Sequence, residues 1–244
     1  MPGYREIAAE LRAAIERGDY PPGVTLPRVI DLAAQYGVNA TTAQRAITVL
    51  RTEGLVAQAR RRGTVVRDRA PVRLSIARYA DATPETGPWQ VACAAQGLDG
   101  WVEVTGVEER EADEIVAREL GLEPGAAVIR RGNRMHIDGD QVPQIQETWL
   151  PLSLFAGTPL AAPERITGGI YRGLADAGHP PSVADVVVIG RMPTQDEANT
   201  LCLDPGSPVL DIRRTTRDRG GRAVVHVHIV VSADRVSLAY RQLL

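Results

Sequence analysis

Apolar positions in the first third of the chain recur at the spacing of amphipathic helices. In residues 4–17 they fall three and four residues apart, and Gly18 follows the run. Similar runs cover residues 27–36 and residues 39 to about 53. Because residues at this spacing share one side of a helix, the pattern predicts three short helices, each with one buried stripe.

A tight turn joins the second and third of these helices. Gly37 is a typical helix stop, and Asn39 is a typical N-cap residue. Two short helices joined by a glycine-containing turn are typical of a helix-turn-helix, in which the second helix reads DNA. Residues 55–59 and 64–67 then read as two strands around a basic turn at 60–63. The order of elements predicts a winged helix-turn-helix in residues 1–70.

The third predicted helix is polar on the outward side of its first half. Amide, hydroxyl and guanidinium groups at this place can hydrogen-bond base edges and phosphates, and arginines at a wing tip can meet phosphates or a minor groove. The candidate DNA-binding residues are Arg28, Asn39, Thr41, Thr42, Gln44, Arg45, Arg61, Arg62 and Gly63. The competing interpretation is a protein-interaction module with a solvated arginine turn.

Strand and helix patterns alternate in residues 71–244, after a stretch rich in Ala, Thr, Pro and Gly that ends at 88. The predicted strands are 102–107, 127–136, 144–150, 186–191, 209–215 and 223–232, and the predicted helices are 112–120, 168–177 and 194–201. The turn at 138–140 indicates a hairpin. Six strands and three helices predict an α+β domain built around an antiparallel sheet.

Charge is divided unevenly between the two predicted domains. The net charge of the whole chain is −2, and every one of its 28 basic residues is arginine. Residues 1–70 hold 11 arginines and 7 acidic residues, whereas the remainder holds 17 arginines and 23 acidic residues. A basic module joined to an acidic domain fits a nucleic-acid-binding protein with a second task.

The two cysteines, Cys93 and Cys202, are far apart in the sequence and are expected to be reduced, buried thiols. No apolar run is long enough for a transmembrane helix, and the N-terminus lacks the apolar segment of a signal peptide. A cytoplasmic protein without membrane contact is expected. Trp89, Trp101 and Trp149 are expected in the core.

The first domain resembles the GntR family of bacterial repressors. The resemblance is carried by Tyr4, Gly18-Asp19-Tyr20-Pro21-Pro22-Gly23, Leu26-Pro27, Leu32-Ala33, Tyr36-Gly37-Val38, Thr42, Arg45-Ala46, Glu53-Gly54-Leu55-Val56 and Gly63-Thr64. Two positions depart from the family. Arg28-Val29-Ile30 stands where the family has Ser-Glu-Arg, and Ala40 replaces an arginine that contacts bases in relatives.

The second domain resembles the UTRA effector domain of HutC-type GntR regulators, which has a chorismate-lyase-like fold. The resemblance is carried by Leu120-Gly121, Val128-Ile129-Arg130-Arg131, Asp138-Gly139, Leu150-Pro151-Leu152, Gly168-Gly169-Ile170-Tyr171, Gly206-Ser207-Pro208-Val209-Leu210 and Asp218-Arg219-Gly220-Gly221. It implies a homodimer that binds a small, often anionic metabolite. Binding would then change how the two DNA-binding heads are held.

A candidate effector site follows from the helix expected to start near residue 168. Free N–H groups and small residues there suit a carboxylate or phosphate, and an arginine of the 127–136 strand could complete an anion clamp. The candidate residues are Arg131, Arg134, Gln146, Thr167, Gly168, Gly169, Tyr171 and His226. Surface ion pairs are the alternative role for the arginines. A solvated or dimer-facing strand side is the alternative for His226 and His228.

The function expected from these features is a ligand-responsive repressor that binds a palindromic site in double-stranded DNA as a homodimer. An enzyme related to chorismate lyase is the main alternative. The sequence shows no Ser-His-Asp order, no Cys beside a His, no metal-ligand cluster and no phosphate loop, so no catalytic residue, metal or cofactor is expected. A helical sensor domain is disfavoured by the strand-rich second half.

Overall fold

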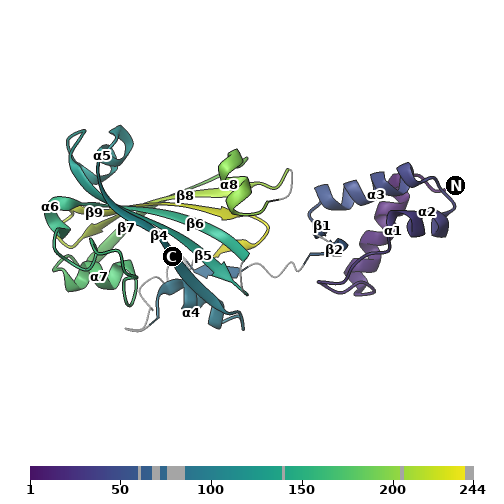
Figure 1. Cartoon of the computed structure of the whole chain (residues 1–244), viewed down its shortest axis with the longest axis horizontal. Coiled ribbons are helices and arrows are strands. Elements are labelled where there is room, and N and C mark those ends of the chain that lie inside the picture. The colour runs from purple at the N-terminus through teal and green to yellow at the C-terminus, as the bar shows by residue number, and fades with distance from the viewer. Residues whose placement is uncertain (60–61, 68–71, 76–85, 139–140, 204–205, 240–244) are drawn as a thin grey trace, which may run out of the picture. The chain divides into compact units, whose positions relative to one another are not determined.

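The computed structural model describes residues 1–59, 62–67, 72–75, 86–138, 141–203 and 206–239. The chain forms two compact units, and the main division falls after residue 71 (Figure 1). The first unit contains α1 (Tyr4–Arg17), α2 (Val29–Tyr36), α3 (Ala40–Thr52), β1 (Val56–Ala59) and β2 (Gly63–Val66). This confirms the predicted winged helix-turn-helix.

The turn between α2 and α3 is built from local signals. Gly37 adopts φ +65°, and its N–H and that of Val38 bond back to carbonyls at the end of α2. Such a left-handed residue is the usual way to close a helix. Asn39 then caps α3, because its Oδ1 accepts the N–H of Thr42 at 2.7 Å. The α3 helix is therefore set firmly against α1 and α2 around one apolar core.

The hairpin of β1 and β2 is tied back to the helices by the chain before α2. Gly23 donates to the carbonyl of Val66, Val66 donates to that of Val24, and Leu26 donates to that of Thr64. These bonds add a short third segment beside the hairpin. They hold the two described strands of the wing close to the helix-turn-helix core.

The second unit is built on one six-stranded antiparallel sheet of strand order β4-β5-β6-β9-β8-β7. Its strands are β4 (Gly100–Glu111), β5 (Ala127–Ile137), β6 (Gln141–Pro151), β7 (Pro181–Arg191), β8 (Val209–Asp218) and β9 (Ala223–Ser232). Its helices are α4 (Pro88–Ala94), α5 (Glu114–Leu120), α6 (Leu152–Phe155), α7 (Ile170–Asp176) and α8 (Gln195–Thr200). The predicted α+β class is confirmed.

The two faces of this sheet have different coverings. Val225, Val227 and Ile229 of β9 point to the face that α4, α6 and α7 cover, which we call the core face. The opposite face, which we call the outer face, carries α5 and α8 (Figure 1). Because cross-strand partners point the same way, the pairing register assigns each strand residue to one of these faces.

A second, two-stranded sheet was not expected from the sequence. β3 (Val72–Ser75), which begins the second unit, pairs in parallel with β10 (Val236–Ala239) near the other end of the chain. Parallel pairing joins segments distant in sequence, so no local pattern reveals it. The chain entering the second unit is therefore held by its last described strand.

Several predicted boundaries were wrong by a few residues. The helix expected from 168 begins at Ile170, and the helix expected from 27 begins at Val29. The helices α4 and α6 were not expected from the sequence. The central residues of the turn at 138–140 lie outside the described residues, as do Arg60 and Arg61 of the wing.

Candidate nucleic-acid interface and ligand site

The outward side of the first half of α3 presents polar side chains to solvent. Thr41, Gln44 and Arg45 are exposed, and Thr42 is half-buried. The opposite side of α3 is buried in the core of the unit. Asn39 is exposed too, but its Oδ1 is used in capping, so its amide NH₂ is the group that remains for a ligand.

The remaining candidates lie before α2 and in the wing. Arg28 is exposed and precedes the first residue of α2. Arg62 is exposed, and its Nη2 donates to the carbonyl of Gly23 at 2.9 Å, which leaves other guanidinium N–H groups for a phosphate. Gly63 begins β2 with φ +89°, a conformation that favours glycine. Arg61 lies outside the described residues.

The core face of the second unit carries an unexpected concentration of buried polar side chains. They are Arg131, Gln144, Thr148, Arg214 and Thr216. Such groups are costly to bury unless they are hydrogen-bonded. The sequence held a signal for this face, because residues 144, 146 and 148 alternate as polar positions along a central strand.

Arg131, predicted from the sequence as part of an anion clamp, is hydrogen-bonded to the backbone. Its guanidinium is buried and donates to three backbone carbonyls, those of Leu160 at 2.9 Å, Ala162 at 2.5 Å and Glu164 at 2.7 Å. Burial lowers the pKa of Arg131, and the charge of Glu164 opposes this. Arg131 therefore holds the loop before α7, and its donors are largely occupied.

Gln146 and Tyr171 point into the same face as Arg131. The amide of Gln146 donates to Oγ1 of Thr148 at 3.0 Å, and the hydroxyl of Tyr171 lies 3.1 Å from Oγ1 of Thr216. Oε1 of Gln144 is buried without a hydrogen-bond partner among the described residues. The structure thus brings three of the predicted effector residues together and adds Gln144, which the sequence analysis missed.

The predicted Thr167-Gly168-Gly169 segment lies just before α7. Gly169 adopts φ +82°, and a Cβ there would come within 2.9 Å of Cδ of Pro88. This close approach, together with the backbone conformation, favours glycine at this position. The segment packs on the chain that leads into α4.

Comparison with known proteins decides the family. The model of the gntR family of bacterial regulatory proteins matches residues 3–66, and the model of the UTRA domain matches residues 95–237. The chain belongs to the GntR family. It is a transcriptional regulator with a UTRA domain.

Individual relatives agree over nearly the whole chain. The HTH-type transcriptional regulator SCO4628 of Streptomyces coelicolor is 34% identical, over 98% of this chain and 92% of its own. The HTH-type transcriptional repressor NagR of Bacillus subtilis is 25% identical, over 98% and 94%. The structure of PhnF from Mycobacterium smegmatis shares the fold, with a TM-score of 0.63 at 23% identity over 97% and 99%. The first two proteins are named as transcriptional regulators, so the enzyme alternative is set aside.

Arg134 and His226 do not join the other predicted effector residues of the UTRA domain. Strand register places both on the outer face, because Arg134 pairs with Ile145 and His226 pairs with Trp149. His226 is buried near α5, with Nδ1 2.9 Å from Oγ1 of Thr215, and burial lowers its pKa. It is therefore neither a solvated side chain nor part of the core-face site.

The outer face also holds an ion-pair network that the sequence analysis did not find. Asp211 is almost fully buried and lies 2.7 Å from Nε of Arg191, 3.1 Å from Nε2 of His228 and 3.3 Å from Nε of Arg213. Arg191 also donates twice to Glu197 of α8. Burial alone would raise the pKa of Asp211, but the arginine hydrogen bond and the nearby positive charges lower it. This network joins α8 to the sheet.

Two expectations about the core need correction. Cys93 is buried, which raises the pKa of its thiol to about 12, but Cys202 is exposed. Trp89 is buried and Trp149 is half-buried, whereas Trp101 is 40% exposed and stacks on His136 with ring centres 3.7 Å apart. Among the described helices, none is long and apolar enough to cross a membrane.

Proposed function

We propose that this GntR-family regulator, of the HutC type, is a sequence-specific repressor whose affinity for a palindromic operator is controlled by a small effector. The observation that carries the proposal is the solvent-exposed, polar first half of α3, presented by a helix-turn-helix on a chain that also has a UTRA domain. The family relative NagR is itself named a repressor. Action on operator DNA would place the protein in the cytoplasm.

Residues 1–70 would bind DNA. The α3 helix would lie in the major groove, with Gln44 and Arg45 at base edges and Thr41 and Thr42 near phosphates. Arg28, Asn39 and the wing residues 61–63 would contact the backbone or a minor groove. Ala40 offers no hydrogen bond to a base, so the operator core should differ from that of relatives with arginine at this place.

Residues 71–244 would bind the effector and a second copy of the chain. We propose that the effector lies against the core face, beside Gln144, Gln146 and Tyr171, with residues 167–169 at its edge. Most of these groups are amides and hydroxyls, and Arg131 is occupied elsewhere. A ligand with hydroxyl or amine donors would satisfy Oε1 of Gln144, and an anionic group on it would meet N–H groups of residues 167–169.

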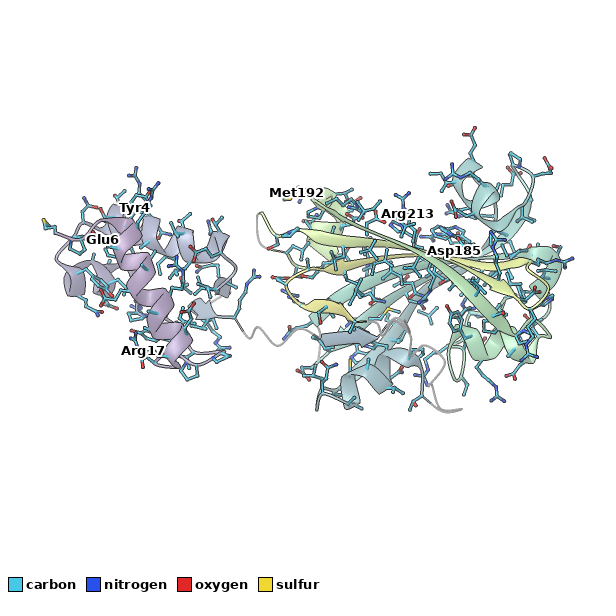
Figure 2. All side chains as sticks on the ribbon, turned by 180° about the vertical axis from the view of Figure 1, so that it is seen from behind. Tyr4, Glu6, Arg17, Asp185, Met192 and Arg213 are labelled. Carbon is cyan, nitrogen blue, oxygen red and sulfur yellow. The ribbon has the colours of Figure 1, made fainter. Side chains whose placement is uncertain are left out.

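We propose that the homodimer forms along β7, the edge strand of the large sheet. Figure 2 shows this strand in front, running from the end near Met192 past Asp185. Large apolar side chains on both its faces are exposed: Val183, Val187, Val188 and Ile189, followed by Met192. A long apolar edge with unpaired backbone groups is unfavourable in a monomer, and a second copy would cover it.

Charge introduced on β7 is therefore expected to break the dimer. Val187→Glu should shift the protein to monomers in analytical ultracentrifugation, because a carboxylate would be buried in the proposed interface. Ile115→Glu on α5 is the matched control, since Ile115 is 49% exposed and Val187 is 55% exposed. If Val187→Glu and Ile115→Glu leave the same oligomer, the interface is not on β7.

The wing is expected to contribute affinity without sequence preference. The double substitution Arg61→Ala and Arg62→Ala should weaken binding to all duplexes and reduce the slope of log affinity against log salt by about one per lost phosphate contact. Fluorescence anisotropy over a salt series measures both quantities. An unchanged slope would show that this turn does not touch the DNA backbone.

Two successive experiments can identify the operator and then the effector. Genomic fragments bound by the purified protein would be selected and sequenced, and metabolites of the neighbouring pathway would then be screened by thermal shift and by release of the selected DNA. We expect a palindromic consensus with half-sites about one or two helical turns apart. Binding without sequence preference would contradict the proposal.

A further inference from the structure

The outer face of the UTRA domain contains a cavity of about 340 Å³ over β5 and β6, beside α8. The side chains used below are Thr105, Arg130, Arg134, Glu147 and Thr200, all of which line it. Strand register puts the proposed effector site on the other face of the sheet, and Asn133 and Gln146 of that face also border the cavity. The volume of the cavity suits a small metabolite.

Gly132 creates the hollow. It lies on β5 between Arg130 and Arg134, and it pairs with Gly106 on one side and Glu147 on the other. The register shifts at this point of β4, and Oγ1 of Thr105 stands 2.5 Å from where a Cβ of residue 132 would be. A side chain at 132 would therefore push Thr105 aside and fill the floor of the cavity.

The two arginines beside Gly132 have different carboxylate neighbours. Arg130 bonds to Glu108 and to Oε1 of Glu147. Arg134 has no hydrogen bond among the described residues, and its nearest carboxylate oxygen, on Glu103, is 3.8 Å away. Its guanidinium therefore keeps N–H donors for a ligand, and Glu147 keeps Oε2 as an acceptor.

Arg134 and Glu147 offer opposite charges to a small dipolar molecule in the cavity. Glu147 faces Gly132, so it is the diagonal cross-strand neighbour of Arg134, at a Cβ separation of about 7–8 Å. Arg130, the other diagonal neighbour of Glu147, already pairs with one of its oxygens, whereas no hydrogen bond or ion pair joins Arg134 to Glu147 among the described residues. A molecule that has a carboxylate and an ammonium group on one carbon can bridge Arg134 and Glu147.

We propose that the outer-face cavity binds a free α-amino acid. Its carboxylate pairs with Arg134, its ammonium group pairs with Glu147, and its α-carbon lies over Gly132. Thr105 and Thr200 face the remainder of the ligand. Its charged contacts lie on the outer face and those of the proposed effector site on the core face, so the regulator would respond to a second small molecule.

The test is isothermal titration of the full-length protein with each common L-α-amino acid. We expect at least one to bind, while its analogues without the amino group or without the carboxyl group do not. Arg134→Gln should weaken this binding about tenfold to a hundredfold, since hydrogen bonds to charged groups are lost. Gly132→Ala should also weaken it. Arg172→Gln, an equal charge change on exposed α7, should not.

Three results would overturn the proposal. One is no binding of any amino acid by a folded protein. Another is binding that survives Arg134→Gln but is lost in Gln144→Leu, which would place the ligand on the core face. The third is a change in dimer dissociation, rather than in ligand binding, on Arg134→Gln, which would make the cavity a protein contact. None of these results changes the expected operator binding, so the proposed function is tested separately.

Discussion

Replacement of Arg131 by methionine is expected to lower the free energy of unfolding of the UTRA domain by about 1–3 kcal/mol. The buried guanidinium donates to the carbonyls of Leu160, Ala162 and Glu164. Methionine fills much of the space but has no donor. A buried acceptor left without a partner costs about 1–3 kcal/mol, and the carbonyl of Leu160 is in that position. Ala162 is half-buried and Glu164 is exposed, so water can replace part of what their carbonyls lose.

Urea unfolding followed by tryptophan fluorescence measures this loss. Arg172→Met is the matched control, because Arg172 is exposed and paired only within α7, where such pairs contribute about 0.3–0.5 kcal/mol. The account would be wrong if Arg131→Met unfolds like the wild type and loses only its response to the effector. Arg131 would then be the ligand cation predicted from the sequence.

Replacement of Asp211 by asparagine is expected to destabilise the domain by about 2 kcal/mol at neutral pH. Breaking a buried ion pair costs about 3–5 kcal/mol, and the expected loss is smaller because Arg191 keeps its two bonds to Glu197. Asp211 is nearly fully buried and lies close to three basic side chains. Water therefore cannot take over the interactions that these side chains lose with its carboxylate.

The same substitution should change the response to acid. The pKa of Asp211 is lower in the folded protein than in the unfolded chain. Its contribution is thus present above the unfolded value, near pH 4, and is lost as the pH falls through the folded value. Urea midpoints of wild type and Asp211→Asn should therefore converge below about pH 4. Asp176→Asn, at an exposed position of α7, should change neither the free energy of unfolding at neutral pH nor its loss in acid by more than about 0.5 kcal/mol.

The sequence was sufficient for those parts of the fold that depend on local patterns. The turn at Gly37 and Asn39 combines a helix stop and a helix cap within three residues, so α2 and α3 could be predicted with their order and exposed side. The six strands of the large sheet were found in the same way. The parallel pairing of β3 with β10 could not be found, because each strand is four residues long and its partner is distant in sequence.

The candidate ligand site was predictable only in part. The structure brings Gln146 and Tyr171 to one face with Arg131. The acceptors for Arg131 are backbone carbonyls, which leave no trace in a sequence. Arg131 and Arg134 are three positions apart on β5, so their side chains point to opposite faces of the sheet. The polarity of Gln144 on a buried strand was the signal that the sequence analysis did not use.

The most direct test of the central claim is discrimination between the selected operator and a scrambled duplex of equal length. Gln44→Ala should reduce the ratio of the two affinities about tenfold or more, since a paired contact to a base contributes about 1–3 kcal/mol of discrimination. Gln35→Ala, the same change at an exposed position of α2, should leave the ratio unchanged. A wild-type ratio in Gln44→Ala and in a companion Arg45→Ala variant would contradict the assignment of α3 as the helix that reads DNA.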